Sequence, residues 1–248
     1  DKTLADNLLI HFEIIPDRLP EQLKDLICLF PDNCLQFEIG IQTFNAQVQE
    51  LISRKQDNIK SIENLKWLKQ KSKANLHTDL IAGLPGEGWE SFASSFNQLV
   101  ALKPNEIQLG ILKRLKGTPI IRHTNKHQLV FNQNPPYEIL STKDLSYHQL
   151  RELIRFARYW EIIANSGKFT HTLTLLLADQ PFQKFYLFSV WLYQYSKNTH
   201  RFSLRKLFDL LYLGGQKLNI DKKLLWDSLW KDYQQAELKG RPEFMKFS

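Results

Sequence analysis

The sequence predicts an α/β domain over residues 1–125 and an α-helical domain over residues 126–248. Two observations predict the first domain. Strand-like segments alternate with amphipathic helical segments, which is typical of βαβ units and a parallel sheet. The strand-like segments are mostly apolar on both faces, or carry polar residues only at their C-terminal ends, as at the working rim of a barrel. Helical patterns rich in aromatic residues dominate the second half and predict the second domain.

Four strands and the helices between them are expected in the first half. The last of these helical stretches carries Phe92, Phe96 and Leu99 at helical spacing, which favours burial of one helix face. The expected strands span residues 8–14, 35–41, 75–82 and 106–112. The expected helices span residues 20–30, 46–53, 59–71 and 89–102. A loop-like stretch follows, from Gly117 to Tyr137.

Capping residues predict where helices begin in the second half. Ser146 is a good N-cap for a helix that runs through Ile163 and ends before Gly167. Pro181 opens a further helix, since proline is favoured in a first helical turn. Two more helices are expected over 204–213, capped by Ser203, and over 222–238, capped by Asp221. The aromatic stripes on these helices favour a packed core over a cofactor site.

Composition narrows the class of protein. The 248 residues are 43% hydrophobic and 24% charged, as in ordinary globular domains. No apolar run reaches the ~18 residues of a membrane span, and the start does not read as a signal peptide. Cys28 and Cys34 form no metal or disulfide framework, so we expect two free thiols in the cytoplasm.

The net charge of +7 lies entirely in the second half. Residues 1–125 hold 15 basic and 15 acidic residues, and residues 126–248 hold the other 18 and 11. A basic region can attract nucleic acid or acidic partners. Here the positive residues are dispersed and form no run of five, so solvated helix faces are favoured and nucleic acid is not an expected partner.

Polar residues and glycines follow the expected strands where each one ends. Glu13, Gln42 and Asp79 occupy such positions in the first three strands. The ends of parallel strands converge on one mouth, where such groups can hold a polar cofactor. Asp79 is the strongest single signal, because a carboxylate inside an apolar run needs a partner.

Two runs of the first half resemble the radical S-adenosylmethionine (SAM) superfamily. They are Phe37-Glu38-Ile39-Gly40-Ile41-Gln42, followed by Arg54-Lys55-Gln56, and Asp79-Leu80-Ile81-Ala82-Gly83-Leu84-Pro85. Together with Phe12-Glu13 and Gly117-Thr118-Pro119, their order is similar to that of the oxygen-independent coproporphyrinogen oxidases. The resemblance implies a partial (βα)₆ barrel, of which this chain would carry strands three to six only.

The resemblance also implies how SAM is bound. Glu13 corresponds to a glutamate near the amino group of SAM, and Arg54 to an arginine that meets its carboxylate. Gln42 and Asp79 correspond to polar residues near the ribose hydroxyls. Ile81 and the edge of the fourth strand at Gly110 would pack against adenine.

A narrower resemblance is to the cobalamin-binding radical SAM proteins, in which a C-terminal helical domain of unknown function follows the barrel. The residues that carry it are 109–120 and 136–140. Cobalamin would then be bound by a domain outside this chain.

The sequence departs from the family at the iron–sulfur cluster. The family's CxxxCxxC motif is not found in the 248 residues, and the chain begins at Asp1 with a strand-like segment. We therefore expect a fragment whose partner is the missing N-terminal part of the same protein. The parent would cleave SAM to a 5′-deoxyadenosyl radical and act on an unknown substrate. The fragment alone would be inactive, with the ligands of the 4Fe–4S cluster outside it.

A non-catalytic binding module is the alternative, with the basic helical half docking nucleic acid or a protein. A CxxxCxxC motif upstream in the parent gene would favour the enzyme. A hydrolase has no support, because the sequence has no Gly-x-Ser-x-Gly elbow and no histidines at metal-ligand spacing.

Overall fold

The computed structural model describes residues 8–238, 240 and 242–244. The chain forms two compact units, Asp1–Leu150 and Arg151–Ser248. The domain boundary expected at residue 125, where strand–helix alternation ceases in the sequence, stays a prediction. Within the described residues, no helix combines the length and the apolar character needed to cross a membrane.

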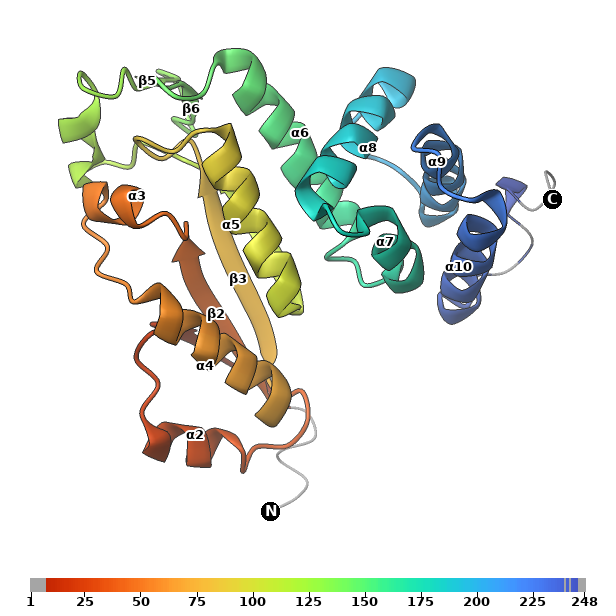
Figure 1. Cartoon of the computed structure of the whole chain (residues 1–248), viewed down its shortest axis with the longest axis horizontal. Coiled ribbons are helices and arrows are strands. Elements are labelled where there is room, and N and C mark those ends of the chain that lie inside the picture. Colours follow the sequence, from red (N-terminus) through yellow and green to blue (C-terminus); the bar gives the residue numbers. More distant parts are fainter. Residues whose placement is uncertain (1–7, 239, 241, 245–248) are drawn as a thin grey trace. The chain divides into compact units, whose positions relative to one another are not determined.

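A four-stranded parallel sheet forms the centre of the first unit (Figure 1). Its strands lie in chain order and are β1 (Ile10–Ile14), β2 (Leu35–Gln42), β3 (Asn75–Ala82) and β4 (Glu106–Ile111). This confirms the α/β class and the parallel sheet predicted from the alternating pattern. Its membership of a six-stranded barrel stays a prediction.

The two faces of this sheet differ in polarity. In β2 and β3 alternate residues are buried and half-buried. The buried set, which includes Phe37, Ile39 and Leu80, lies on the apolar face. The expectation that the strands are mostly apolar on both faces, or carry polar residues only at their C-terminal ends, is therefore wrong for β2 and β3. Gln36, Glu38 and His77 alternate with the apolar residues because side chains of a strand point to opposite faces.

Helices α4 and α5 lie along one face of the sheet in Figure 1. The helices of this unit are α2 (Glu21–Ile27), α3 (Ala46–Leu51), α4 (Asn58–Lys71) and α5 (Trp89–Leu102). Side-chain caps fix where two of them begin: Asn45 accepts hydrogen bonds from the first turn of α3, and Asp57 does so for α4. In α5, Phe92, Phe96 and Leu99 are buried, as their spacing predicts.

The stretch after β4 is more ordered than the sequence predicts. It contains a short 3₁₀ helix, η1 (Pro119–His123), and an antiparallel pair, β5 (Val130–Phe131) and β6 (Ile139–Ser141). The backbone NH of Ile139 donates to the carbonyl of Leu112, which ties β6 to the end of β4. Strands of two and three residues are too short for a period-two pattern to reveal.

Five helices make up the rest of the described chain: α6 (Tyr147–Ile163), α7 (Thr170–Leu177), α8 (Pro181–Ser196), α9 (Leu204–Lys217) and α10 (Lys222–Gln235). The predicted caps Ser203 and Asp221 accept hydrogen bonds from the first turns of α9 and α10. In the second unit Phe156, Phe185 and Phe208 are fully buried, so the aromatic stripes form a core as predicted.

Helix α7 was not predicted and depends on a distant carboxylate. Asp232 of α10 is fully buried. Its two oxygens accept hydrogen bonds from the backbone NH groups of His171 and Thr172, at 3.0 and 2.8 Å, in the first turn of α7. Phe169, the N-cap residue of α7, makes no side-chain cap hydrogen bond, and the Asp232 side chain accepts these hydrogen bonds in its place.

We expect Asp232→Ala to destabilise the protein by about 1–3 kcal/mol, because it leaves the NH groups of His171 and of the buried Thr172 without this acceptor. Chemical unfolding followed by circular dichroism measures the change. Asp227→Ala, also in α10 but only partly buried, is the control and should change stability much less. Equal losses in the two variants would contradict the capping role.

Candidate functional site

A cavity of about 510 Å³ lies on the polar face of the sheet. This volume is in the range of small-molecule sites. Its lining residues come from all four strands and from the segment after α3: Glu13, Ile14, Ile15, Glu38, Gly40, Gln42, Arg54, Asp79 and Gln108. The structure thus brings Glu13, Gln42, Arg54 and Asp79 together, as the sequence predicts.

The strand register arranges this face in rows. Paired residues of parallel strands point the same way, so Glu13, Glu38, His77 and Glu106 form one row. The next row contains Gly40, Asp79 and Gln108. Successive rows lie about 6.6 Å apart, the rise of two strand residues. Glu13 therefore lies one row deeper than Asp79, rather than level with it.

Gly40 provides the space in which Arg54 and Asp79 approach each other. The Arg54 guanidinium donates a hydrogen bond to the carbonyl of Gly40 and another to Gln56 at 2.8 Å. A Cβ added at Gly40 would lie 3.5 Å from the guanidinium and 3.8 Å from the Asp79 carboxylate. The absent side chain thus leaves room beside two opposite charges.

Burial shapes the acidity of Asp79. Desolvation raises the pKa of Asp79 to about 6, the positive charge of Arg54 opposes this, and Glu38 and Glu13 raise it further. Asp79 can therefore change its protonation state in the range from weakly acidic to neutral pH. An acceptor of this kind binds hydroxyl groups best when it is ionised.

Gln42 ends β2 in a backbone conformation that is uncommon for its residue type. Its φ is 64°, in the left-handed region, and the register shifts between Gly40 and Gln42. Bulges of this kind redirect side chains and are common next to functional sites. The irregularity directs Gln42 into both the large cavity and a smaller one.

A buried network behind Gln42 holds this irregular turn. The Thr43 hydroxyl donates to Glu87 Oε1 at 2.6 Å, and Ser91 donates to the same oxygen at 3.1 Å. Ser95 accepts from the backbone NH of Phe44 at 3.0 Å. Glu87 is fully buried, and desolvation raises its pKa to about 7 despite these two hydrogen bonds.

The smaller cavity, of about 170 Å³, adjoins the first at Gln42. It is mostly apolar, with Ile81, Leu84 and Leu112 among its lining residues. Ile81 pairs with Gly110 in the register, and a Cβ at Gly110 would lie 3.7 Å from Ile81. The predicted adenine-packing residues therefore lie next to each other, on the row beyond Asp79.

Sequence reasoning did not select Glu38, His77, Glu106 and Glu87 as site residues. The first three could have been found, because polar residues recur two apart within otherwise apolar strands. Glu87 carries no such signal, since its burial depends on how α5 packs.

Among the described residues, no group of three or more His, Cys, Asp or Glu side chains could hold a metal ion. Cys28 is exposed and Cys34 is buried. The donor set of the described chain therefore does not fit a 4Fe–4S cluster, which is held by cysteine thiolates.

Comparison with known proteins agrees with this geometry. Residues 2–99 match the family model of the radical SAM superfamily. This part of the chain is thus similar to the radical SAM superfamily. Residues 125–247 match the family described as a protein of unknown function, DUF4080, so the match to this family follows the radical SAM match along the chain.

The similar curated proteins point to the same core. The oxygen-independent coproporphyrinogen III oxidase of Synechocystis sp. is 30% identical over 104 residues, which are 42% of this chain and 22% of the relative. The enzyme of the same name from Escherichia coli is 31% identical over 100 residues, which are 40% of this chain and 21% of that protein. This chain thus spans about a fifth of the length of these oxidases.

Two further proteins are similar over larger parts of the chain. The uncharacterized protein YtqA of Bacillus subtilis is 28% identical over 135 residues, covering 54% of this chain and 42% of that protein. The solved structure of coproporphyrinogen III oxidase (HemN) from Escherichia coli matches with a TM-score of 0.45 and 23% identity. It covers 62% of this chain and 34% of that one.

The buried Glu87 predicts a pH-dependent stability. Because burial raises its pKa from 4.5 to about 7, the folded state binds a proton more tightly than the unfolded state does. Stability should therefore fall as pH rises from about 4.5 to about 7. Glu87→Gln resembles the protonated carboxyl and should remove the part of this fall that Glu87 causes, while the part below about pH 6 that Asp79 causes should remain.

Thermal unfolding at pH 5 and pH 8 measures the effect, which should be on the order of 1–3 kcal/mol. The exposed Glu90 supplies the control, since Glu90→Gln should keep the pH dependence of the unmodified chain. An unchanged pH dependence in Glu87→Gln would show that Glu87 is ionised in the folded state throughout this range.

Proposed function

We propose that the large cavity binds SAM and that this chain is the SAM-binding part of a radical SAM enzyme. The observation that carries the proposal is the convergence of Glu13, Gln42, Arg54 and Asp79 on one cavity from separate segments of the chain. Motif order in the sequence points to the same four residues. The superfamily match of residues 2–99 supports the same assignment.

The chemistry of these side chains fits SAM. The planar guanidinium of Arg54 suits the carboxylate of its methionine part. Asp79 can accept from two ribose hydroxyls, and Glu13 suits the ammonium group. The space beside Gly40, between Arg54 and Asp79, is a place where a small polar ligand contacts both charges. Gln42 lies between this space and the apolar cavity of Ile81, which suits adenine.

When bound to a cluster, SAM supplies a 5′-deoxyadenosyl radical that abstracts a hydrogen atom from a substrate. The residues of this chain bind and orient SAM. Arg54 binds the carboxylate of SAM, and Asp79 binds its ribose hydroxyls. The hydrogen bond from Thr43 to Glu87 keeps Gln42 in its irregular conformation. The burial of this network also limits the entry of water behind the site.

The rest of the enzyme lies, on this proposal, in another part of the same protein. β1 is an edge strand of the sheet, and the neighbouring Leu9, Phe12 and Ile15 are each about half exposed. Earlier strands of the barrel would cover them and carry the cluster cysteines. This chain alone would then be inactive. Cobalamin stays a prediction that depends on a further domain.

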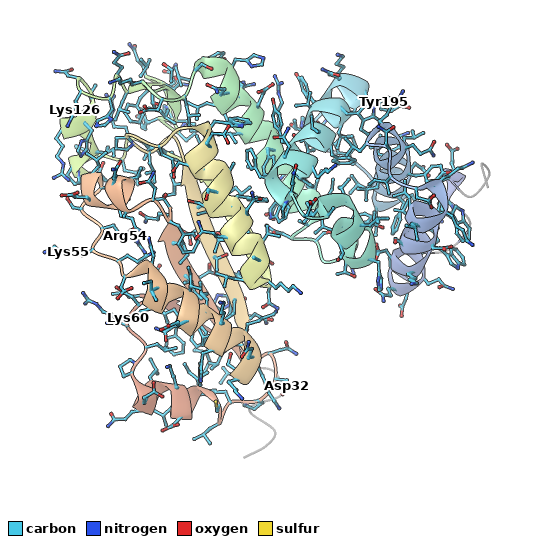
Figure 2. The ribbon with its side chains drawn as sticks, viewed as in Figure 1. Asp32, Arg54, Lys55, Lys60, Lys126 and Tyr195 are labelled. Atoms are coloured by element: carbon cyan, nitrogen blue, oxygen red, sulfur yellow. The ribbon has the colours of Figure 1, made fainter. Side chains whose placement is uncertain are left out.

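Arg54→Ala and Asp79→Ala should each weaken SAM binding about ten- to a hundredfold, because each removes a charge-assisted contact of on the order of 1.5–3 kcal/mol. Isothermal titration of the cluster-loaded full-length protein measures this. Lys55, next to Arg54 but exposed and projecting outward, provides the control Lys55→Ala (Figure 2).

Melting temperatures of the same variants separate binding from folding. A purely structural role for both residues would lower the melting temperature and leave the SAM affinity of the folded protein unchanged. That outcome would refute the assignment of these residues to SAM, even though the fold would stand.

The 248-residue chain alone should bind no 4Fe–4S cluster after anaerobic reconstitution with iron and sulfide. Its two cysteines are fewer than the three thiolates that this superfamily's motif provides. Iron analysis and the absorption near roughly 400 nm provide the measurement. A stable band with about four irons per chain would contradict the proposed division of the site.

A further inference from the structure

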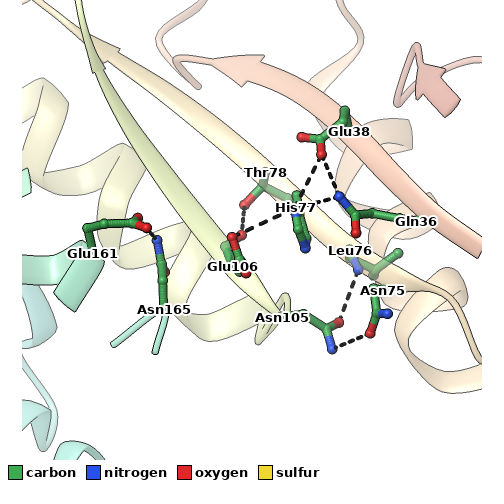
Figure 3. Close-up of polar contacts among 10 residues, drawn as sticks. All are labelled: Gln36, Glu38, Asn75, Leu76, His77, Thr78, Asn105, Glu106, Glu161 and Asn165. Atoms are coloured by element: carbon green, nitrogen blue, oxygen red, sulfur yellow. Dashed lines mark hydrogen bonds and ion pairs between the residues drawn. The ribbon is translucent and has the colours of Figure 1, made fainter. Parts of the chain in front are cut away.

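Figure 3 shows a polar network on the polar face of the sheet. Its row is next to that of Asp79, toward the N-terminal ends of the strands. His77 of β3 points its Nδ1 atom at Glu38 of β2, 3.2 Å from Oε1, and lies 3.7 Å from Glu106 of β4. The Gln36 amide donates to the same Glu38 oxygen at 2.9 Å and is 3.1 Å from Nδ1. Residues of β2 and β3 therefore hold Glu38 in one orientation, and Glu106 of β4 contacts the same histidine.

This network occupies a place where barrels usually have a packed apolar core. The interior of a (βα) barrel is filled mainly by branched apolar side chains. Here the His77 side chain is 13% exposed, and those of Glu38 and Glu106 are 34% and 32% exposed. Partly buried charges contribute little to stability in comparison with apolar packing. Of these three residues Glu38 lines the cavity, and a charge held at a cavity wall is better explained by binding than by folding.

The charges on the cavity wall are not balanced. Of the nine residues that line it, Glu13, Glu38 and Asp79 carry carboxylates and Arg54 carries the one guanidinium. SAM brings a carboxylate, an ammonium and a sulfonium, and so a single net positive charge. When all three carboxylates are ionised, one negative charge remains without a counterpart on the wall or on SAM.

We propose that Glu38, oriented by Gln36 and His77, binds an ammonium or other cationic group of the enzyme's substrate. The inference rests on the proposed function, in which SAM occupies the row of Asp79 and Arg54. Glu38 lies about 6.6 Å below that row and beside Glu13 in its own row, so a substrate held there is next to the ammonium end of SAM and contacts neither Arg54 nor Asp79. Both of these contacts of Glu38 are made by Oε1, so the proposal assigns the cationic group to Oε2.

Glu106 has a positioning role in this arrangement. It contacts the His77 ring from the strand opposite Glu38 and does not line the cavity. Its Oε2 lies 3.7 Å from Nδ1, the atom that faces Glu38, and so helps to hold the ring in this orientation. A substrate rich in carboxylates would meet Glu13, Glu38 and Asp79 together and would be repelled.

The test uses the 248-residue chain and three four-carbon probes: 1,4-diaminobutane, 1,4-butanediol and succinate. We expect saturable binding of the diamine, roughly millimolar, and at least about tenfold weaker binding of the diol and of succinate. Nuclear magnetic resonance of the His77 ring reports occupancy of this site directly. Absence of saturable diamine binding, or equal binding of succinate, would overturn the proposal without the use of any variant.

Variants then locate the probe. Glu38→Gln should weaken diamine binding at least about fivefold, whereas Glu63→Gln, which removes an exposed charge of α4, should not. If Glu13→Gln carries the loss in place of Glu38→Gln, the diamine occupies the SAM ammonium site and the proposal fails.

Titration of the cluster-loaded full-length protein with SAM separates the two proposals. Glu38→Gln should leave SAM affinity unchanged. Diamine binding that depends on Glu38, in a protein whose SAM affinity does not depend on Arg54 or Asp79, would support the cation site and contradict the SAM assignment. SAM affinity lost in Glu38→Gln would overturn the cation site.

Discussion

The parallel register of β2 and β3 is the constraint on which the rest of the first unit depends. Because side chains alternate between faces, one register places Phe37, Ile39 and Leu80 in the core and Glu38, His77 and Asp79 on the opposite face. A slip of one residue would exchange the two sets and bury the charges in the core. The apolar core and the cavity are therefore two results of the same pairing.

Gln42, the left-handed residue at the end of β2, lies where the pairing of β2 with β3 becomes irregular. Left-handed backbone at a residue other than glycine costs on the order of 1–2 kcal/mol. The hydrogen bonds of Thr43 to Glu87 and of Phe44 to Ser95 offset this cost within a dry interior. The Glu87 carboxylate accepts two hydroxyl hydrogen bonds in this buried position, and burial raises its pKa. The network thus maintains the shape of Gln42, which the core alone does not determine.

How much of the fold could be predicted from the sequence depends on how far apart in the chain the interacting residues lie. The bounds of β3 and α5 were predicted residue for residue, because long periodic segments and local breakers define them. Helix α7 was missed because its cap comes from Asp232, about sixty residues away in the chain. The pair β5–β6 was missed because it is too short to have a period.

The candidate site was predicted in a similar way. Motif order identified Gln42, Arg54 and Asp79, which the structure places around one cavity. The depth of Glu13 could not be predicted, because it depends on the register between β1 and β2. Glu38, His77 and Glu106 were visible as letters, but the meaning of the row appears only when three strands are aligned side by side.

Gly40 has a consequence for the volume of the large cavity. Arg54 and Asp79 come within ordinary contact distance of the position that a methyl group would take there. Gly40 lines the large cavity, so an alanine would reduce the volume of that cavity while the strand's hydrogen bonds stayed in place. Position 40 therefore sets the size of the cavity more than the stability of the sheet.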